Sequence, residues 1–221
     1  MRRLANDVWQ LRGFPPNVIN VYVLQDVLVD AGTRRAVRRV RRQTAPLPLT
    51  AHALTHAHPD HQGASHAICT ERGIPLWCGA GDVEAMETPG GIARSQPPGL
   101  LNRLQNRFWT GPPHPVARAL REGDVVAGFE VLEVPGHSPG HVAFWRAGDG
   151  VLVAGDVLNN MDVRTGMLGL REPLPAFTPD PERNRESIRR LAALRPSLTL
   201  FGHGPPLRDW RKLERFVENL R

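Results

Sequence analysis

The sequence predicts a single mixed α/β domain, and three observations support this. Short apolar runs rich in valine alternate along the chain with stretches of helical periodicity. The chain has 221 residues, of which 41% are hydrophobic, and this is enough for one well-packed core. No stretch has the composition of an interdomain linker, so residues 1–221 are expected to form one domain. Periodicity alone leaves α/β and α+β architectures open.

The first half of the chain alternates strands with helices. Residues 17–24 and 27–30 are apolar and valine-rich, which predicts a β-hairpin. The arginine-rich run over 34–42 predicts a short helix that keeps Ala36, Val37 and Val40 inward and its arginines in solvent. The remaining predicted elements of this half are a strand at 49–55, a helix at 60–72, a strand at 74–77 and a short helix at 82–87.

Residues 88–115 change character, because prolines and glycines surround a helical stretch at 100–108. We expect this segment to be an insertion that lies over the face carrying the functional site. Strands are then predicted at 116–120, 129–134, 142–145 and 151–154. Residues 161–177 have no clear period, and a helix at 181–194, a strand at 198–201 and a terminal helix at 209–220 follow.

Charge and cysteine content bear on the expected partners and on the cellular location of the protein. The formal net charge is +6, but Lys212 is the only lysine, so the excess reflects an arginine bias rather than a surface built to follow phosphates. We therefore expect no nucleic-acid partner. The sequence shows no signal-peptide pattern and no run of membrane-spanning length. Cys69 and Cys78 are expected to be buried, reduced thiols. A cytoplasmic protein without a membrane partner is the expectation.

A histidine-rich motif points to metal binding. The segment Thr55-His-Ala-His-Pro-Asp-His61 brings His56, His58, Asp60 and His61 within six positions. Neutral imidazole and carboxylate groups suit zinc, iron and manganese. A lone His-x-His pattern would carry little weight, and Asp60 alone could serve as a helix N-cap.

Three later residues strengthen this interpretation. His137, Asp156 and His203 each follow a predicted strand and have glycine beside them. Glycine lets backbone and metal approach closely, and loops at strand ends are where sheet-based folds usually carry their functional groups. The seven residues together predict the site of a binuclear metal hydrolase.

The motifs, in this order, resemble the metallo-β-lactamase-fold hydrolase superfamily, and in particular its glyoxalase/lactonase-like branch. The resemblance runs from about Asn17 to about Leu207 and implies a four-layer αββα sandwich. It implies one metal held by His56, His58 and His137, a second held by Asp60, His61 and His203, and Asp156 as the bridge between them. His141 is implied to support the ligands rather than bind metal.

The implied cofactor is a pair of divalent metal ions. Zinc is the expected metal, and iron or manganese would suit the same ligands. A hydroxide held between the two ions would attack a carboxylic thioester, ester or lactone of a small-molecule substrate, and Asp60 could also manage the proton of that nucleophile.

Several relatives of this fold fit the sequence less well. Val157-Leu158-Asn159-Asn160 follows the bridging aspartate where glutathione thioesterases carry a Cys-Gly-Arg-like turn. Tyr22, the only tyrosine, lies far from the metal motifs in the sequence, which disfavours lactonases that use a tyrosine hydroxyl. Asp156 itself disfavours a β-lactamase. Two alternatives remain open: a mononuclear iron dioxygenase acting on thiol persulfides, which would use His56, His137 and Asp156, and a phosphodiesterase or nuclease.

The segment after Asp156 predicts the substrate pocket. Residues 161–177 mix methionine, leucine and phenylalanine with few charges, and methionine adapts to varied apolar shapes. Met167 and Leu168 are therefore expected to contact an apolar acyl group, although packing of the loop on the core or a subunit contact would use the same residues.

Overall fold

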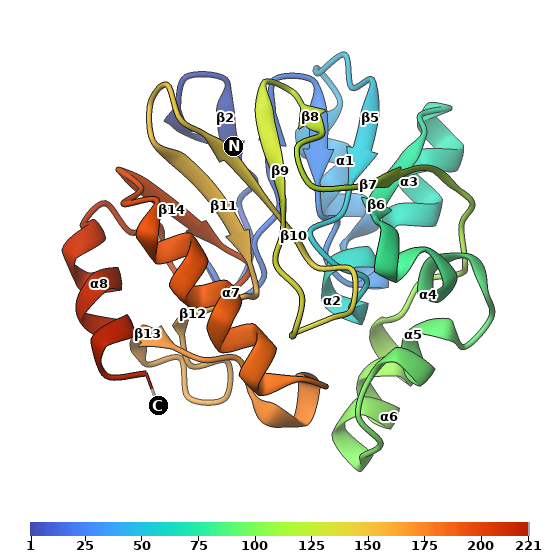
Figure 1. Cartoon of the computed structure of the whole chain (residues 1–221). Coiled ribbons are helices and arrows are strands. Elements are labelled where there is room, and N and C mark those ends of the chain that lie inside the picture. The colour runs from blue at the N-terminus through green and yellow to red at the C-terminus, as the bar shows by residue number, and fades with distance from the viewer. Residues whose placement is uncertain (221) are drawn as a thin grey trace.

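Two β-sheets packed face to face, with helices on both outer faces, make up the computed structural model, which describes residues 1–220 (Figure 1). The chain completes the first sheet before it enters the second. This order decides which half of the molecule supplies each side chain of the site.

The first sheet has its seven strands in sequence order. The first four strands pair antiparallel, and β4 to β7 pair parallel. The strands are β1 (Arg2–Ala5), β2 (Val8–Gln10), β3 (Tyr22–Leu24), β4 (Val27–Val29), β5 (Ala51–Ala53), β6 (Leu76–Gly79) and β7 (Val116–Leu120). The predicted hairpin of residues 17–30 is confirmed as β3 and β4.

The second sheet has five strands in the order β14-β11-β10-β9-β8. Its pairs are antiparallel except β11 with β14, which are parallel. The strands are β8 (Val125–Val126), β9 (Phe129–Glu133), β10 (Val142–Arg146), β11 (Val151–Gly155) and β14 (Leu198–Phe201).

Successive side chains of a strand point to opposite faces of its sheet, and this places them in different layers of the core. In β10, Val142 and Phe144 face the core between the two sheets, whereas Ala143 faces the outer core. The same period of two places Tyr22 between the sheets and Val23 on the outer face of the first sheet. Strands buried on both faces need apolar residues at every position, and this explains the continuous apolar runs in the sequence.

Helices close both outer faces. The helices that pack on the first sheet include α1 (Val37–Thr44), α3 (Ser65–Arg72), α4 (Val83–Glu87) and α5 (Gly91–Ser95). The second sheet is covered by α7 (Pro181–Ala193) and α8 (Trp210–Glu218), on the opposite side of the molecule in Figure 1. The four layers are therefore helix, sheet, sheet and helix, and the expected αββα sandwich is confirmed.

The structure also contains elements that were not predicted. Strands β1, β2 and β8 are short, and residues 161–177 include part of a two-stranded hairpin, β12 (Asn159–Met161) with β13 (Leu168–Arg171). The predicted helix at 60–72 is divided into α2 (Pro59–Gln62) and α3. Gly63 lies at the division, where the backbone of Arg34 and Trp109 comes too close for any side chain.

The remaining elements are one helix and three short 3-10 turns. Helix α6 (Leu100–Trp109) confirms the helical stretch predicted inside residues 88–115. The turns are η1 (Arg34–Ala36), η2 (Ala80–Asp82) and η3 (Pro175–Phe177). Within residues 1–220, no helix is long and apolar enough to cross a membrane.

Candidate metal centre

All seven residues of the predicted metal site meet at one edge of the sandwich. His56 and His58 lie in the loop after β5, and Asp60 and His61 lie in the short helix α2. His137 follows β9, Asp156 follows β11 directly, and His203 follows β14. The first sheet therefore supplies four of these residues and the second sheet supplies three.

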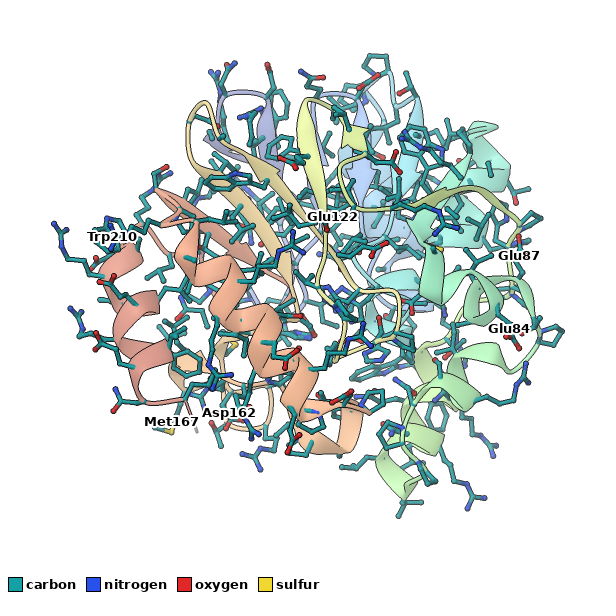
Figure 2. All side chains as sticks on the ribbon, viewed as in Figure 1. Glu84, Glu87, Glu122, Asp162, Met167 and Trp210 are labelled. Atoms are coloured by element: carbon teal, nitrogen blue, oxygen red, sulfur yellow. The ribbon has the colours of Figure 1, made fainter. Side chains whose placement is uncertain are left out.

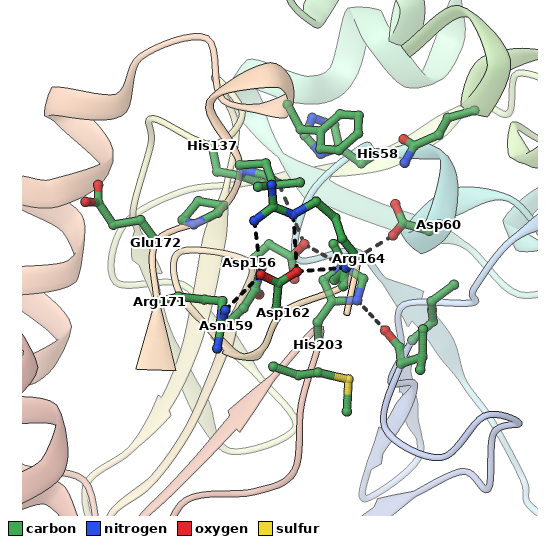
Figure 3. A pocket seen from close by; sticks show the side chains of 18 of the residues that line it. His58, Asp60, His137, Asp156, Asn159, Asp162, Arg164, Arg171, Glu172 and His203 are labelled. Carbon is green, nitrogen blue, oxygen red and sulfur yellow. Dashed lines mark hydrogen bonds and ion pairs between the residues drawn. The ribbon is translucent and has the colours of Figure 1, made fainter. Parts of the chain in front are cut away.

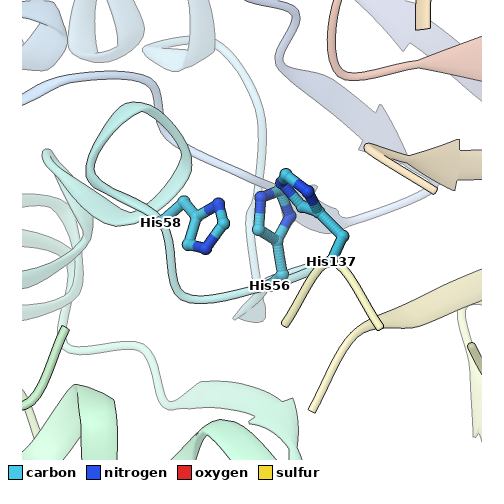
Figure 4. Close-up of side chains that lie close together, drawn as sticks. All are labelled: His56, His58 and His137. Carbon is cyan, nitrogen blue, oxygen red and sulfur yellow. The ribbon is translucent and has the colours of Figure 1, made fainter. Parts of the chain in front are cut away.

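The ligand atoms of these residues form three overlapping groups, and within each group they lie within 4.8 Å of one another. The groups are His56 with His58 and His137 (Figure 4), His56 with His61 and Asp156, and Asp60 with His61 and His203. The first and third groups are the two metal positions that the sequence resemblance implies.

Asp156 lies between these two positions. Its Oδ2 is 2.9 Å from His203 Nε2, 3.5 Å from His61 Nε2 and 3.7 Å from His137 Nε2. One carboxylate thus faces imidazoles of both groups, which is the place that a bridging ligand requires.

The buried polar atoms of the site fit metal ions. The Nε2 atoms of His56, His58, His61 and His137, together with Asp156 Oδ1, are buried and have no hydrogen-bond partner among residues 1–220. Buried polar atoms without partners are rare and costly in proteins. Coordination of a cation by these nitrogen and oxygen atoms would remove that cost, and the donor set suits zinc, iron or manganese.

The opposite ring nitrogens hold the imidazoles in place. Asp30 Oδ2 accepts a hydrogen bond from His61 Nδ1 at 2.9 Å, and the Thr55 hydroxyl, itself bound to Asp30, lies 3.0 Å from His56 Nδ1. His137 Nδ1 lies 3.0 Å from Thr178 Oγ1. When these rings are neutral, the contacts leave each Nε2 as the nitrogen with a free lone pair.

His203 is oriented from the opposite half of the molecule. Its Nδ1 donates to the Val18 carbonyl oxygen, in the segment that precedes β3. Nearby, the Tyr22 hydroxyl donates to the Phe201 carbonyl oxygen at 2.7 Å. Buried Tyr22 therefore links the two sheets by a hydrogen bond. This agrees with the expectation that its hydroxyl is not placed over the metals as in some lactonases.

Asp82 joins two of the loops that carry ligands. Its carboxylate accepts hydrogen bonds from Ala57 N, Ser138 Oγ and Gly140 N, each at 2.8 Å. Ala57 separates His56 from His58, and Ser138 follows His137. One buried carboxylate thus sets the spacing between histidines from the two sheets.

His141 lies behind the donor groups, next to Asp156 and His56. Its Nε2 accepts the backbone N–H of Asp156 at 3.0 Å, and its ring stacks on His56 at 4.7 Å between centroids. It belongs to none of the three groups of ligand atoms in the described part of the chain. His141 can therefore position Asp156 and His56 without binding a metal itself.

The electrostatics of the site separate neutral from charged groups. Burial and the neighbouring imidazoles hold the pKa values of His56 and His137 well below the usual range, so both are neutral at neutral pH. Burial opposes the charge of Asp156, but His203 and His61 outweigh it and lower its pKa well below the usual range. A neutral imidazole and an ionised carboxylate are the forms that bind metal.

A cavity of about 370 Å³ opens onto the metal-facing groups (Figure 3). Its floor includes His58, Asp60, His137, Asp156 and His203, and much of its wall is apolar. The apolar wall residues include Val18, Ile19, Leu101, Trp109, Met161, Leu174 and Phe177. Helix α6, which lies within residues 88–115, contributes Leu101 and Trp109.

The prediction for the substrate pocket is wrong in its two named residues. Met167 and Leu168 are 67% and 66% exposed, and Figure 2 shows Met167 at the periphery of the molecule. Neither lines the cavity among the residues that the structure describes. The hairpin turns these two side chains outward because β13 pairs with β12, a pairing that the sequence pattern did not reveal.

The other histidines have partners outside the site. His52 Nδ1 donates to the Leu28 carbonyl oxygen and its Nε2 accepts from Ser65 Oγ. His66 and His114 contact each other through their Nδ1 atoms at 3.2 Å.

Sequence reasoning missed Asp30, Thr55, Asp82 and Thr178. Asp30 carried a usable signal, because it ends the apolar strand run of residues 27–30. The role of Thr178 depends on packing alone.

Comparisons with known proteins show which family and which solved structures this chain is similar to. Residues 14–203 match the profile of the metallo-beta-lactamase superfamily. The probable metallo-hydrolase YflN of Bacillus subtilis is 30% identical over 226 residues, covering 89% of this chain and 84% of its own length. A hydroxyacylglutathione hydrolase of Fuscovulum blasticum is 30% identical, covering 85% of this chain and 66% of its own length. The crystal structure of TTHA1623 in a di-iron-bound form has a TM-score of 0.65 and 31% identity, covering 94% of this chain and 91% of its own.

Proposed function

Because this chain belongs to the metallo-β-lactamase superfamily, we propose that it is a metal-dependent hydrolase of small carboxylic thioesters, esters or lactones, with two divalent ions at its centre. The observation that carries the proposal is the pair of donor groups with Asp156 between them, at the floor of a mostly apolar cavity. Similarity to a hydroxyacylglutathione hydrolase, a thioesterase by name, supports the substrate class.

The metal-facing residues divide into two sets with one bridge. His56, His58 and His137 would hold one ion, Asp60, His61 and His203 would hold the other, and Asp156 would contact both. Zinc is our first choice, and iron is the main alternative because TTHA1623 binds two iron ions. Two such ions would supply Lewis acidity, which favours ionisation of water near neutral pH and polarises a carbonyl group.

The protein side chains contribute position and proton transfer. Asp60 lies at the cavity floor with Oδ2 3.3 Å from His203 Nε2, so its carboxylate can take a proton from an attacking water molecule. Trp109, Leu174 and Phe177 form an apolar wall that excludes water and suits the acyl part of a substrate.

Elemental analysis combined with a substrate panel tests the proposal. The panel contains thioesters, esters, lactones, phosphodiesters and β-lactams, each assayed with zinc, manganese and ferrous iron. We expect two metal ions per chain and cleavage of at least one carboxylic substrate. Cleavage of phosphodiesters or β-lactams alone would assign a different reaction to the same centre.

The iron dioxygenase alternative predicts a different result. That chemistry needs only His56, His137 and Asp156, and it leaves the group of Asp60, His61 and His203 without a role. One iron per chain and oxygen consumption with a thiol persulfide would replace the hydrolase proposal.

A further inference from the structure

A cluster of three charged residues lies in the wall of the cavity, on the hairpin β12–β13 and its connecting turn. Asp162, Arg164 and Arg171 all line the cavity, and Figure 3 shows Asp162 between the two arginines. Asp162 Oδ2 accepts Arg164 Nη2 at 3.1 Å and Arg171 Nη1 at 2.9 Å. Because two guanidinium groups share one carboxylate, the cluster has a net charge of +1.

Of the two arginines, Arg164 is the one whose guanidinium group still has a nitrogen without a hydrogen-bond partner among the described residues. Arg171 uses its three guanidinium nitrogens within the hairpin, on Gly169 O, Asp162 Oδ2 and Met167 O. Arg164 uses Nε and Nη2 on Asp162, and its Nη1 has no partner in residues 1–220. Its side chain is 65% exposed. Arg171 therefore fixes the aspartate, and Arg164 keeps donors free for a ligand.

The other acid in this wall does not cancel the charge. Glu172 also lines the cavity, but Arg185 Nε binds it at 2.8 Å. The remaining carboxylates of the cavity, Asp60 and Asp156, lie among the metal-facing groups at the floor. A small anion that enters the cavity thus meets a guanidinium with free donors on one side and the metal-facing groups on another.

We propose that Arg164 binds a carboxylate of the substrate, so that the substrate carries an anionic group on an apolar body, apart from the bond that is cleaved. A guanidinium recognises carboxylates through directed, charge-assisted hydrogen bonds. The apolar wall residues, Leu174 and Phe177 among them, suit the body of such a molecule. This inference rests on the proposed function and narrows its substrate class.

The alternative role for Arg164 is purely structural. Asp162 Oδ1 accepts the backbone N–H of Arg164 at 2.8 Å, so the ion pair could serve only to shape the turn. Substitution by glutamine separates the two roles, because Arg164→Gln can still donate a hydrogen bond to Asp162 but removes the charge. Arg103→Ala is the matched control, because Arg103 is an exposed arginine on α6 that is not among the lining residues.

Ligand binding without turnover tests the proposal. Titration calorimetry on the metal-loaded protein compares pentanoate with glutarate, hexanoate with adipate, and heptanoate with pimelate. In each pair the chain length is equal and only the second carboxylate differs. We expect the dicarboxylate of at least one pair to bind about tenfold more tightly. Arg164→Gln and Arg164→Ala should abolish this preference, and Arg103→Ala should retain it.

Two results would overturn the proposal: equal affinities within every pair for the unaltered protein, or a preference that survives in both Arg164 variants. Circular dichroism shows whether each variant is folded. Because binding is measured without catalysis, a protein that prefers dicarboxylates but cleaves no carboxylic substrate would contradict the proposed function alone. A protein that cleaves esters without this preference would contradict only the role of Arg164.

Discussion

At the scale of single residues, the candidate centre depends on groups that never face the cavity. Asp30 is 1% exposed, yet it holds His61 directly and His56 through Thr55. A carboxylate behind an imidazole fixes the ring orientation and makes the other nitrogen a better ligand. The geometry of the metal-facing nitrogens is therefore set one layer below the cavity surface.

Loss of a donor atom should lower the metal content of the centre. Asp156→Ala and His137→Ala are expected to abolish hydrolysis and to lower the metal content, because each removes an atom that faces other donors of the site. Metal analysis by mass spectrometry and activity on the best panel substrate measure both effects. A variant with normal activity and full metal content would remove that residue from the site.

His141→Ala should have a milder effect than either. Its ring accepts the Asp156 N–H and stacks on His56, so its loss disturbs the ligands without removing one. We expect activity to fall ~10–100-fold while the metal content is nearly kept. Loss of a full equivalent of metal would show that His141 is itself a ligand.

His52 should make stability depend on pH. Burial, opposed by its hydrogen bond to Leu28, lowers the pKa of His52 to about 4, whereas an unfolded histidine titrates near its ordinary value of about 6.5. The unfolded chain thus binds the proton first, and stability falls as the pH drops from about 6.5 to about 4.

Chemical denaturation at several pH values measures this effect. His52→Gln keeps a donor and an acceptor but cannot titrate in that range. Between pH 6 and pH 5, the variant should lose about 1 kcal/mol less stability than the unaltered protein. If the stability of the unaltered protein and that of His52→Gln changed equally with pH, the pKa of His52 would not be lowered by folding.

Sequence alone could find the metal-facing residues because the chemistry limits their types and local spacing reveals them. His56 to His61 lie within one short motif, and His137, Asp156 and His203 stand beside glycines after apolar strands. Asp82 and Thr178 lack such a pattern, since their partners lie in distant parts of the chain. Their roles arise only from the packing of one loop on another.

At the scale of elements, the ends of strands bring backbone very close to the ligands. A Cβ on Gly202, just after β14, would stand 1.9 Å from Asp156 Oδ1 and 2.7 Å from His61 Cε1. The glycine beside His203 is therefore a steric requirement of the centre, as its position in the sequence suggested.

Gly202→Ala should weaken metal binding while the fold persists. The added methyl group must displace Asp156 or His61, and we expect metal affinity to fall ~10–100-fold. Gly148→Ala is the matched control, because a Cβ there meets no atom within 4 Å among the described residues. Competition with a chelator measures the affinity of both variants, and equal affinities would show that the site adapts to the methyl group.

Elements with strong periodicity were predictable, and the hairpin β12–β13 was not. Helix α6 and strand β14 match their predicted ranges closely, because their apolar residues recur with the right period. Residues 161–177 mix prolines, glycines and charges, and the order of the segment comes from the pairing of β13 with β12. The charged residues of this segment line the cavity, whereas Met167 and Leu168 point outward.

At the scale of the whole molecule, the two cysteines report on global unfolding. Both are buried, and burial raises the pKa of Cys69 to about 12 and raises that of Cys78 further. Because thiolates react and thiols do not, labelling by a thiol reagent at neutral pH should require unfolding.

Metal removal should therefore accelerate labelling. Ligands from both sheets meet at the centre, so bound metal stabilises the folded chain by about 4 kcal/mol when its free concentration is about a thousand times its dissociation constant. A chelator should lower the melting temperature and speed labelling of Cys69 and Cys78 together. Rapid labelling of the metal-loaded protein at moderate temperature would contradict this.

The order in which the chain contributes its donors has a consequence for biosynthesis. The donor group of His56, His58 and His137 is complete in sequence at residue 137, whereas the group of Asp60, His61 and His203 awaits β14 near the C-terminal end of the described chain. With Asp156 as the proposed bridge, the donors of the first metal position are complete in sequence at residue 156, dozens of residues before His203 completes the second. If these groups hold the metals as proposed, uptake on the ribosome has a fixed direction. A nascent chain stalled before β14 has all the donors proposed for the first ion but lacks His203, a donor proposed for the second.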